Sequence, residues 1–394
     1  MKIALVCPAS LPATQFGGIL FLCVDIAKEL SDQGHEVEIF TTDLDFANNA
    51  KTFNKKLLRI EQYDHYKINR THPWLSYSLF FINPKIYSEI KNFHPDIIHS
   101  IGVRSFQSFM AAIVSKKENI PLIISDQGGL TTHPDLDNAN MIKKFLFRLQ
   151  EPMIKYIVNR ATRISVANEY EKKIFETYCN SSKITIIRNG IDLEIQNKHI
   201  TNFKKKYNIQ NSFILFLGRF HTVKGIDILL KSIHLIQNDP LFLNVQLVIM
   251  GVDFGFQNQM LKMIKELKIA EKVIVIKNPP RLDVLSAYKE CEFLVLPSRW
   301  ELSPLTPLEG FAFKKTVVST TSHGIPYTIS HQKNGLLVES ENYKEFAKSI
   351  LYLLKNKDKR DEFGLNGFNL VQDLCNSKTM SKKTLELYEK VINR

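Results

Sequence analysis

Cysteine is scarce in this sequence, and the few cysteines that occur are not spaced for metal binding or disulfides. The 394 residues contain five cysteines, an odd number with no C-x-x-C pair. A disulfide framework and a cysteine-based zinc site are both disfavoured, so a reducing compartment is expected.

Long apolar runs are also absent. No stretch approaches the ~18 apolar residues that a membrane-spanning helix needs. The first apolar run, from Ile3 to Cys7, stops at Pro8 and is too short for the core of a secretory signal. We interpret it as a first strand. We expect a cytoplasmic protein and leave open a peripheral contact with the inner membrane face.

An acidic surplus is lacking as well, because the formal net charge is +12. The basic excess favours phosphate-bearing ligands or anionic lipid surfaces. Lysines on solvated helix faces are the simpler explanation, and no nucleic-acid partner is expected. The length of 394 residues and the hydrophobic content of 44% predict globular packing in two domains.

The stretch from Pro297 to Thr320 carries the clearest functional pattern. A loop between two predicted strands should turn into a helix near Ser303, which is a suitable N-cap. Pro304 suits the first helical position, where no N–H is needed. The N–H groups of Leu305 and Thr306 would then lack helical partners and form a phosphate-binding site.

Two glutamates bracket this predicted helix start. Glu301 lies in the loop before it, and Glu309 lies about one turn inside the helix. The arrangement suits a nucleotide sugar, with the diphosphate on the helix end, the ribose hydroxyls on one carboxylate and the sugar facing the other. An ordinary strand–helix–strand crossover with solvated carboxylates fits the same pattern.

Glu301 and Glu309 resemble the Glu-x7-Glu signature of the retaining glycosyltransferases of family 4. Eight nearby residues fit that family as well: Pro297, Ser298, Trp300, Leu308, Ala312, Val317, Val318 and Ser319. Further matches extend the resemblance over nearly the whole chain. It implies an α/β protein of the GT-B fold, in which two Rossmann-like domains face each other across a cleft that holds the donor.

The resemblance also implies a domain organisation. An N-terminal, acceptor-side Rossmann-like domain is expected over residues 1–187. A C-terminal Rossmann-like domain that binds the nucleotide sugar is expected over residues 188–376. The last helix, within residues 377–394, is expected to pack back on the first domain.

The first predicted strand leads into a loop with two adjacent glycines, Gly17 and Gly18, and then into a helix. This order is a Rossmann-like opening, although no G-x-G-x-x-G motif is present. Adjacent glycines let a ligand approach the backbone, and a simple tight turn explains them equally well. In the resembled family this loop faces the donor diphosphate.

A second glycine turn follows the predicted strand Phe213 to Leu217. Arg219 stands in this turn and Lys224 at the entry of the next helix, as in the Gly-Arg…Lys-Gly motif of the resembled family. A departing nucleoside diphosphate gains negative charge, which fixed cations can stabilise. Alone, the two residues would be ordinary surface bases. With the two glutamates downstream, we interpret them as donor-binding and catalytic, and we expect no metal or other cofactor.

The acceptor side is predicted in the loop after the strand Pro121 to Ile124. Many members of the resembled family have a histidine there, near the reacting sugar, and this sequence has Gln127 instead. Asp126 is a candidate proton acceptor, and His133 is a candidate substitute for the missing histidine. A surface position explains His133 equally well.

The phosphate-binding turn also departs from the family pattern. Pro304 stands where glycine is common, so one backbone donor is missing. Ser303, Leu305 and Thr306 are therefore the expected phosphate contacts.

Two Asp-x-Asp pairs resemble cation-binding motifs, Asp43-Leu44-Asp45 and Asp135-Leu136-Asp137. We interpret both as surface loops, because a cation site needs several converging oxygens and no further ligands are near them. His99 is expected at the end of a strand.

Residues 140–160 carry apolar side chains at helical spacing with basic side chains between them. The pattern predicts a basic amphipathic surface that meets a membrane holding a lipid-linked acceptor. A core-packed helix with a solvated basic face fits the same pattern, and we regard it as the simpler explanation.

The activity implied by the resemblance is the transfer of a sugar from a nucleoside-diphosphate sugar to a hydroxyl acceptor with retained configuration. The acceptor is a glycan or a lipid-linked saccharide, and no metal is used. Glu301 is expected to orient the sugar and Glu309 to hold the ribose. No nucleophile or base is evident, which suits a front-face mechanism in which the leaving phosphate takes the acceptor's proton. A nucleotide-sugar epimerase or hydrolase and a non-catalytic sugar-nucleotide binder are the alternatives.

Overall fold

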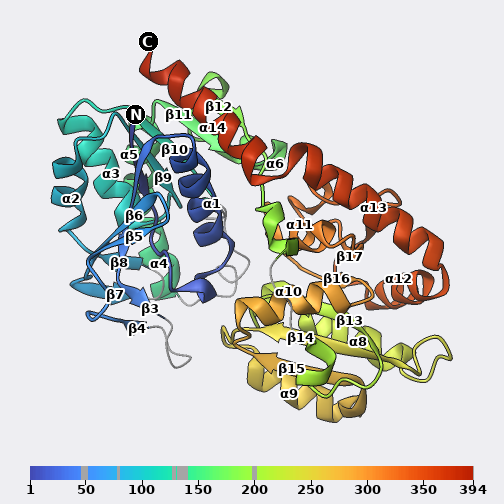
Figure 1. Cartoon of the computed structure of the whole chain (residues 1–394). Helices are drawn as coiled ribbons and strands as arrows, with labels where there is room; N and C mark the ends of the chain where they lie inside the picture. Colours follow the sequence, from blue (N-terminus) through green and yellow to red (C-terminus); the bar gives the residue numbers. More distant parts are fainter. Residues whose placement is uncertain (46–51, 78–79, 127–129, 131–140, 198–201, 394) are drawn as a thin grey trace. The chain divides into compact units, whose positions relative to one another are not determined.

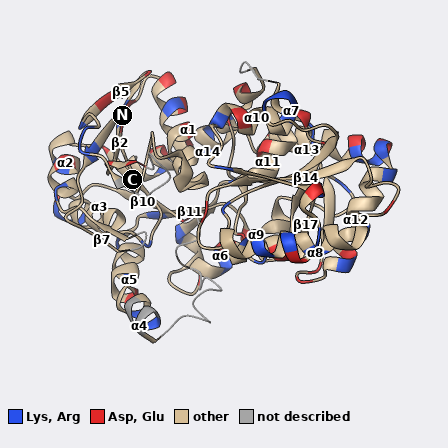
Figure 2. Cartoon of the chain, turned by 90° about the horizontal axis from the view of Figure 1, so that it is seen from below, with Lys and Arg blue, Asp and Glu red and all other residues tan. Residues whose placement is uncertain are grey.

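The computed structural model describes residues 1–45, 52–77, 80–126, 130, 141–197 and 202–393 (Figure 1). Among these residues, no helix combines the length and the apolar content that crossing a bilayer requires. Figure 2 shows Lys and Arg positions next to Asp and Glu positions on helices such as α8 (Ile226–Ile236) and α9 (Gln257–Glu266). This mixture is what charged residues on solvated helix faces produce.

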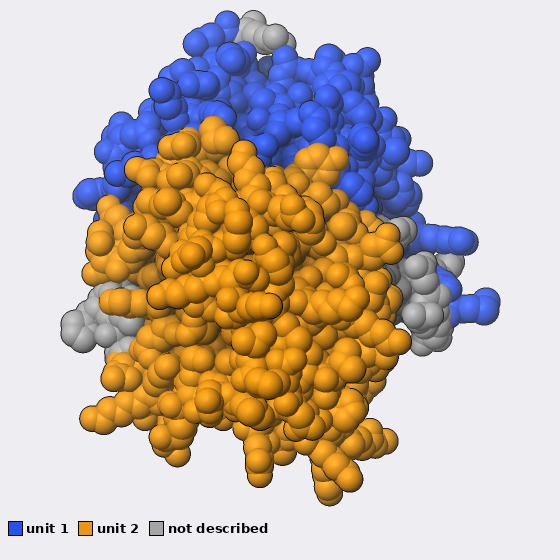
Figure 3. Space-filling view, turned by 90° about the vertical axis from the view of Figure 1, so that its right-hand side faces the viewer, with its two compact units in different colours: residues 1–190, 377–394 blue, residues 191–376 orange. Residues whose placement is uncertain are grey.

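The chain divides into two compact units, coloured separately in Figure 3. Unit 1 comprises Met1–Gly190 and Ser377–Arg394, and unit 2 comprises Ile191–Asn376. The domain limits expected from the sequence were 1–187 with 377–394, and 188–376. The chain therefore passes from unit 1 to unit 2 and returns with its last helix.

Unit 1 is built on an eight-stranded sheet with the order β12-β11-β10-β9-β1-β2-β6-β5. Only β5, at one edge, is antiparallel to its neighbour. The strands are β1 (Lys2–Val6), β2 (Glu36–Thr42), β5 (Ile60–Tyr63), β6 (Tyr66–Thr71), β9 (Ile97–Ile101), β10 (Leu122–Ser125), β11 (Arg163–Val166) and β12 (Ile184–Ile186). The chain starts in the middle of the sheet and builds outward on both sides, as Rossmann-like units do.

Helices cover both faces of this sheet, because successive residues of a strand point to opposite faces. On β1, Ile3 and Leu5 join the core formed with α1 (Gly18–Asp32) and α14 (Ser377–Ile392), while Ala4 and Val6 join the other core. That second core is formed with α2 (Ile86–Phe93), α3 (Phe106–Lys117) and α5 (Glu151–Arg160). The sheet is therefore buried on both faces, which is typical of parallel sheets.

The predicted helix over residues 140–160 is two helices in the structure, α4 (Met141–Leu149) and α5, which meet at Gln150. The α5 helix buries Ile154, Ile157 and Val158 and leaves Lys155 exposed. A core-packed helix with a solvated basic side therefore describes α5.

The last helix, α14, is fixed to unit 1 by polar contacts as well as by apolar ones. The Tyr388 hydroxyl lies 2.6 Å from His99 Nδ1, and the Ser377 hydroxyl donates to Glu29 Oε1 at 2.6 Å. The prediction of His99 at a strand end was wrong, because His99 is the central residue of β9 and is buried. Burial lowers the pKa of its imidazole to about 3, so the ring is neutral.

Unit 2 contains a six-stranded sheet with the order β15-β14-β13-β16-β17-β18, in which every pair is parallel. The strands are β13 (Ser212–Leu217), β14 (Val245–Gly251), β15 (Val273–Lys277), β16 (Leu294–Leu296), β17 (Val317–Thr320) and β18 (Gly335–Val338). Numbered along the unit, the order is 3-2-1-4-5-6, which is the order of dinucleotide-binding Rossmann sheets.

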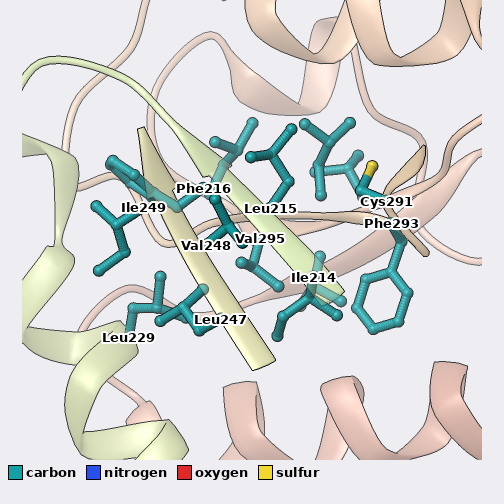
Figure 4. Close-up of a cluster of buried hydrophobic side chains, with 14 of the residues drawn as sticks. Ile214, Leu215, Phe216, Leu229, Leu247, Val248, Ile249, Cys291, Phe293 and Val295 are labelled. Carbon is teal, nitrogen blue, oxygen red and sulfur yellow. The ribbon is translucent and has the colours of Figure 1, made fainter. Parts of the chain in front are cut away.

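The helices of unit 2 connect and cover these strands. Besides α8 and α9 they are α7 (Phe203–Lys206), α10 (Arg281–Glu290), α11 (Leu305–Ala312), α12 (Tyr343–Lys355) and α13 (Lys357–Leu374). Figure 4 shows part of the core, where side chains of β13, β14 and β16 meet Leu229 of α8. The apolar runs that predicted these strands thus form the buried layer that carries the loops at the sheet edge.

Candidate functional site

The site predicted in unit 2 lies where its strand order reverses. β13 pairs with β14 on one side and with β16 on the other, so the chain continues from β13 and from β16 toward opposite edges of the sheet. Ligands of open α/β sheets bind at such a point, beyond the carboxyl ends of the strands. The loop after β13 carries Arg219 and Lys224, and the loop after β16 carries Glu301.

Backbone contacts at two glycines hold the loop after β16 against the turn after β13 and against the loop after β17. A Cβ at Gly225 would lie 2.0 Å from the carbonyl oxygen of Pro297, and a Cβ at Gly324 would lie 1.6 Å from that of Leu302. The Gly324 N–H also donates to the Glu301 carbonyl at 2.9 Å. Any side chain at these two positions would push the loops apart, which explains why both are glycine.

Lys224 and Glu301 form an ion pair within unit 2. The same carboxylate oxygen, Glu301 Oε1, accepts a hydrogen bond from the Ser298 hydroxyl at 3.1 Å. Both side chains of the pair are largely but not fully buried, with 16% and 18% of their surface exposed. The pair fixes the Lys224 ammonium next to the carboxylate predicted to orient a sugar.

Arg219 is the second residue after β13, and its guanidinium carbon lies 5.0 Å from the centre of the Phe254 ring. The ring face restrains the guanidinium by a cation–π contact. Phe254 belongs to the loop after β14, whose backbone bonds to Phe220. Three neighbouring strand ends therefore contribute to this site.

The helix start after Glu301 differs from the prediction by one residue. Pro304, and not Ser303, is the N-cap of α11, and Leu305 is the first helical residue. Pro304 has extended backbone angles, φ −67° and ψ 129°, and a Ser303 cap with Pro304 inside the helix was therefore wrong.

Two prolines limit the amides that this helix end can offer. Neither Pro304 at the cap nor Pro307 in the first turn has an N–H group. Of the four orphan amides at a usual helix start, Leu305 and Thr306 supply the two that exist here. They are the two amides that the sequence assigned to phosphate binding.

Glu309 lies inside α11 and is buried, with 8% of its surface exposed. Arg281 donates to both of its oxygens, at 2.6 Å to Oε1 and 3.2 Å to Oε2. The Tyr288 hydroxyl lies 2.9 Å from Oε2. Burial, and then the neighbouring carboxylate, raise the pKa of the Tyr288 phenol, which keeps it a donor. Each carboxylate oxygen retains acceptor capacity for a ligand hydroxyl.

Arg281 and Tyr288 are the site residues that sequence reasoning missed. Both lie on α10, more than twenty residues before Glu309, and neither stands at a motif spacing. The only available signal was that a buried carboxylate on a helix needs a cationic or hydroxyl partner.

A third missed residue, Arg299, holds the Glu301 loop in place. Its guanidinium donates to both oxygens of Asp227 at 2.7 and 2.8 Å and to the Thr222 carbonyl at 2.6 Å. Its backbone N–H donates to the Val223 carbonyl at 2.7 Å. Arg299 thus connects the loop that carries Glu301 to the turn that carries Lys224.

The remaining predicted site residues belong to unit 1. Gly17 is the N-cap of α1, and Gly18 is its first residue. Asp126 is the first residue after β10 and is buried. Its carboxylate accepts hydrogen bonds from the backbone N–H groups of Val103 at 3.3 Å and Leu130 at 2.9 Å. Gln127 and His133 lie outside the described residues.

A second buried carboxyl, Glu171, lies near Asp126 at the same edge of the sheet. Glu171 Oε2 accepts the Ala167 N–H at 2.7 Å, and Asn168 caps the start of α6 (Glu169–Phe175). Burial, with a smaller contribution from the Asp126 charge, raises the pKa of Glu171 to about 8. Glu171 is therefore a neutral acid at neutral pH.

The first Asp-x-Asp pair is not a surface loop, which corrects the prediction. Asp43 is buried and lies 2.7 Å from His72 Nδ1, and Asp45 accepts a hydrogen bond from Asn54 at 2.8 Å in the strand β3 (Leu44–Asp45). The second pair lies outside the described residues. In the part of the chain that the structure describes, no three His, Cys, Asp or Glu side chains come together as metal ligands.

Two family profiles match consecutive parts of the chain. The profile described as Glycosyltransferase Family 4 matches residues 16–195, and the profile described as Glycosyl transferases group 1 matches residues 199–370. The two spans lie almost entirely within units 1 and 2, respectively.

Curated relatives match over nearly their full lengths. An uncharacterised glycosyltransferase of Methanocaldococcus jannaschii is 22% identical over 99% of this chain and 98% of its own length. Spore coat protein SA of Bacillus subtilis is 21% identical over 99% of this chain and 100% of its own length.

Solved structures share the fold. Sucrose-phosphate synthase from Thermosynechococcus elongatus has a TM-score of 0.78 at 17% identity, covering 100% of this chain and 99% of its own. Anabaena HepE in complex with UDP-glucose has a TM-score of 0.76 at 18% identity, covering 99% and 100%. The chain therefore belongs to the group 1, family 4 glycosyltransferases and is an enzyme of the GT-B fold.

Proposed function

We propose that this glycosyltransferase takes its sugar from a nucleoside-diphosphate donor held by unit 2 and passes it to a hydroxyl acceptor with retained configuration. The observation that carries the proposal is the convergence of Lys224, Glu301 and the α11 amides at the strand-order reversal of unit 2. Such a point is where nucleotides bind in Rossmann-like sheets. HepE, which shares the fold, holds UDP-glucose in its crystal structure, and this supports a nucleotide-sugar donor.

The donor would be bound by groups with distinct roles. Its diphosphate lies against Arg219, Lys224 and the N–H groups of Leu305 and Thr306. Its ribose hydroxyls donate to Glu309, whose oxygens Arg281 and Tyr288 hold in place. We propose that Arg219, Lys224 and the two amides stabilise the diphosphate without a further ligand.

In the proposed reaction, the bond between the anomeric carbon and the diphosphate oxygen breaks as the acceptor oxygen bonds to the same face of that carbon. The acceptor's proton passes to the oxygen of the leaving diphosphate. Lys224 and Arg219 stabilise the negative charge that this oxygen gains before it is protonated. Glu301 orients the sugar and keeps the Lys224 ammonium beside the leaving group.

We also propose that Asp126, which follows β10, and the residues Gln127 and His133 further along the chain contribute to acceptor binding. A glycan or a lipid-linked saccharide is the acceptor class. A metal-independent mechanism is part of the proposal, because both glutamates of the Glu-x7-Glu pattern already have cationic partners.

The substitution Glu301→Gln tests the proposal. The donor is first identified by the thermal shift that UDP, GDP and ADP sugars produce, since a bound ligand raises apparent stability. Glu301→Gln should then lower the transfer rate by about 10²–10³-fold, while the affinity for the nucleoside diphosphate stays within about threefold. The exposed Glu266→Gln, on α9 of the same unit, is the matched control and should transfer normally.

Two results would contradict the proposal. Full transfer by Glu301→Gln would remove Glu301 from the reaction. Binding of a sugar nucleotide without either transfer or hydrolysis, over a range of glycan and lipid-linked acceptors, would instead favour a non-catalytic binder.

A further inference from the structure

A buried chain of three side chains connects the last helix of unit 1 to the end of β10. The hydroxyl of Tyr388 on α14 lies 2.6 Å from His99 Nδ1, and His99 Nε2 lies 2.9 Å from the hydroxyl of Ser125, the last residue of β10. All three residues are buried, and the Tyr388 ring stands edge-on to the imidazole, with 5.7 Å between the ring centres. The C-terminal helix is therefore coupled by hydrogen bonds to the strand that precedes Asp126.

The hydrogen bonds of this chain run in one direction, from α14 toward β10. Burial raises the pKa of the Tyr388 phenol, which therefore keeps its proton and donates it to His99 Nδ1. The imidazole is neutral and has a single N–H, so with Nδ1 accepting, that proton is on Nε2 and is donated to Ser125. The Ser125 hydroxyl is left to donate its own proton elsewhere.

A small cavity next to Ser125 has room for an acceptor of that proton. Its volume is about 20 Å³, and a single buried water needs roughly 10–15 Å³. The polar residues of its wall are His99, Ser125, Ser165, Asn189 and Thr384. One water molecule in this cavity would accept from Ser125 and satisfy the end of the chain.

Asp126, the next residue, makes its contacts on the other face of the sheet. Its carboxylate accepts the N–H groups of Val103 and Leu130, and both of these residues belong to the core formed with α3 and α5. Ser125 is also held by its carbonyl, which accepts the Gly102 N–H at 2.9 Å. The end of β10 is thus held from both faces, so loss of the contact on the α14 face should be felt at Asp126.

We propose that Tyr388 is a positioning residue for the acceptor, acting through His99 and Ser125 on the strand end from which Asp126 extends. Hydrogen bonds in such a buried chain strengthen one another, because each polarises the next at low local dielectric. This inference rests on the proposed contribution of Asp126 to acceptor binding. A chain that only fastens α14 to unit 1 would leave Asp126 unaffected by changes at Tyr388.

Hydrogen–deuterium exchange of the full chain tests the coupling. Tyr388→Phe removes the hydroxyl and keeps the ring, and the amides of Val103 and Leu130 report on Asp126 because they donate to it. Both amides should exchange about threefold faster or more, the effect of losing one hydrogen bond. Ser125→Ala breaks the chain at its other end and should act in the same way. The double variant should add little, because both changes remove one network.

Ser377→Ala is the matched control. It removes the hydroxyl that ties the start of α14 to Glu29, a polar contact of the same helix that does not involve His99. Exchange within α14 should become faster in this variant, and the amides of Val103 and Leu130 should keep their rates.

The effect on the reaction is measured with the donor selected by thermal shift and with p-nitrophenyl glycosides as hydroxyl acceptors. Tyr388→Phe should raise the KM for the glycoside by about three- to tenfold and leave the KM for the donor within about twofold. Asp126→Asn should raise the KM for the glycoside as well. If Asp126→Asn does not, the proposed role of Asp126 fails, whatever the exchange rates show for the coupling.

Three results would overturn the positioning role of Tyr388. The first is unchanged exchange at Val103 and Leu130 in both Tyr388→Phe and Ser125→Ala. The second is equal acceleration at these amides by Tyr388→Phe and Ser377→Ala, which would mean that the chain only fastens α14. The third is a normal KM for the glycoside in Tyr388→Phe when Asp126→Asn raises it.

Discussion

Arg281 is the residue whose role depends most on its geometry, because it donates to both oxygens of Glu309. A lysine keeps the positive charge and cannot make this two-oxygen contact. If Glu309 holds the ribose, Arg281→Lys should weaken binding of the nucleoside diphosphate by about three- to tenfold, the loss expected for one hydrogen bond.

The ribose hydroxyls show whether Arg281 acts through Glu309. Removing the 3′-hydroxyl from the nucleotide should cost affinity in the unsubstituted enzyme and much less in Arg281→Lys, as titration calorimetry would measure. Equal losses in both proteins would mean that Arg281 only supports the fold. Tyr288→Phe removes another donor to Glu309 and should act in the same direction.

Glu171 gives a pH-dependent prediction. Its pKa is about 8 in the folded chain, against about 4.3 when unfolded. Between these values the folded state binds more protons, so the contribution of Glu171 to stability is full at acid pH and is lost as the pH rises toward 8. Glu171→Gln keeps the neutral form at every pH.

The thermal midpoint of Glu171→Gln, relative to the unsubstituted protein, should therefore rise by several degrees as the pH is raised from 5 to 8. Glu169→Gln is the control, because Glu169 is an exposed neighbour on the same helix, and its relative midpoint should not change with pH. If the difference in thermal midpoint between Glu171→Gln and the unsubstituted protein stays constant from pH 5 to pH 8, Glu171 is not a neutral acid in the folded chain.

At the scale of elements, the loops at the edge of the unit 2 sheet depend on backbone contact. Gly324→Ala would place a Cβ 1.6 Å from the Leu302 carbonyl oxygen. We expect a loss of about 1–3 kcal/mol in the free energy of unfolding, because overpacking forces the backbone to move. The Glu301 loop would move with it, so transfer should fall as well.

Gly218→Ala is the control for stability. Its Cβ would lie 3.4 Å from the Phe216 ring, which is close to ordinary contact. Urea unfolding of the two variants measures the difference. Equal free energies of unfolding for the two variants would show that the loop at Gly324 accommodates the added methyl group without a loss of stability.

Elements were the part of the fold that the sequence predicted best. The apolar run from Phe213 to Leu217 and the glycine turn after it gave β13 and the position of Arg219, because buried parallel strands and their turns have strong local patterns. The helix start at α11 was misplaced by one residue, since Pro304 is compatible with both a cap and a first helical position.

Contacts between distant elements were not predictable in this way. The Arg281–Glu309 pair and the Arg299–Asp227 pair join residues 28 and 72 positions apart. Only the packing of the sheet decides which of the many charged side chains meet.

At the scale of the whole molecule, each unit has its own sheet, parallel throughout in unit 2 and parallel except for the edge strand β5 in unit 1, and α14 returns the end of the chain to unit 1. Family profiles matched to each half agree with this division. In unit 2 the proposed donor contacts come from the loops after β13, β14 and β16 and from α10 and α11. Gly17 and Gly18, which the resemblance also assigns to the donor, belong to unit 1.

A crystal structure of the chain with a bound nucleoside diphosphate tests the central proposal most directly. The account predicts the diphosphate against Arg219, Lys224 and the amides of Leu305 and Thr306, with the ribose on Glu309. Density for the phosphates elsewhere on the chain, or a ribose with no contact to Glu309, would contradict it.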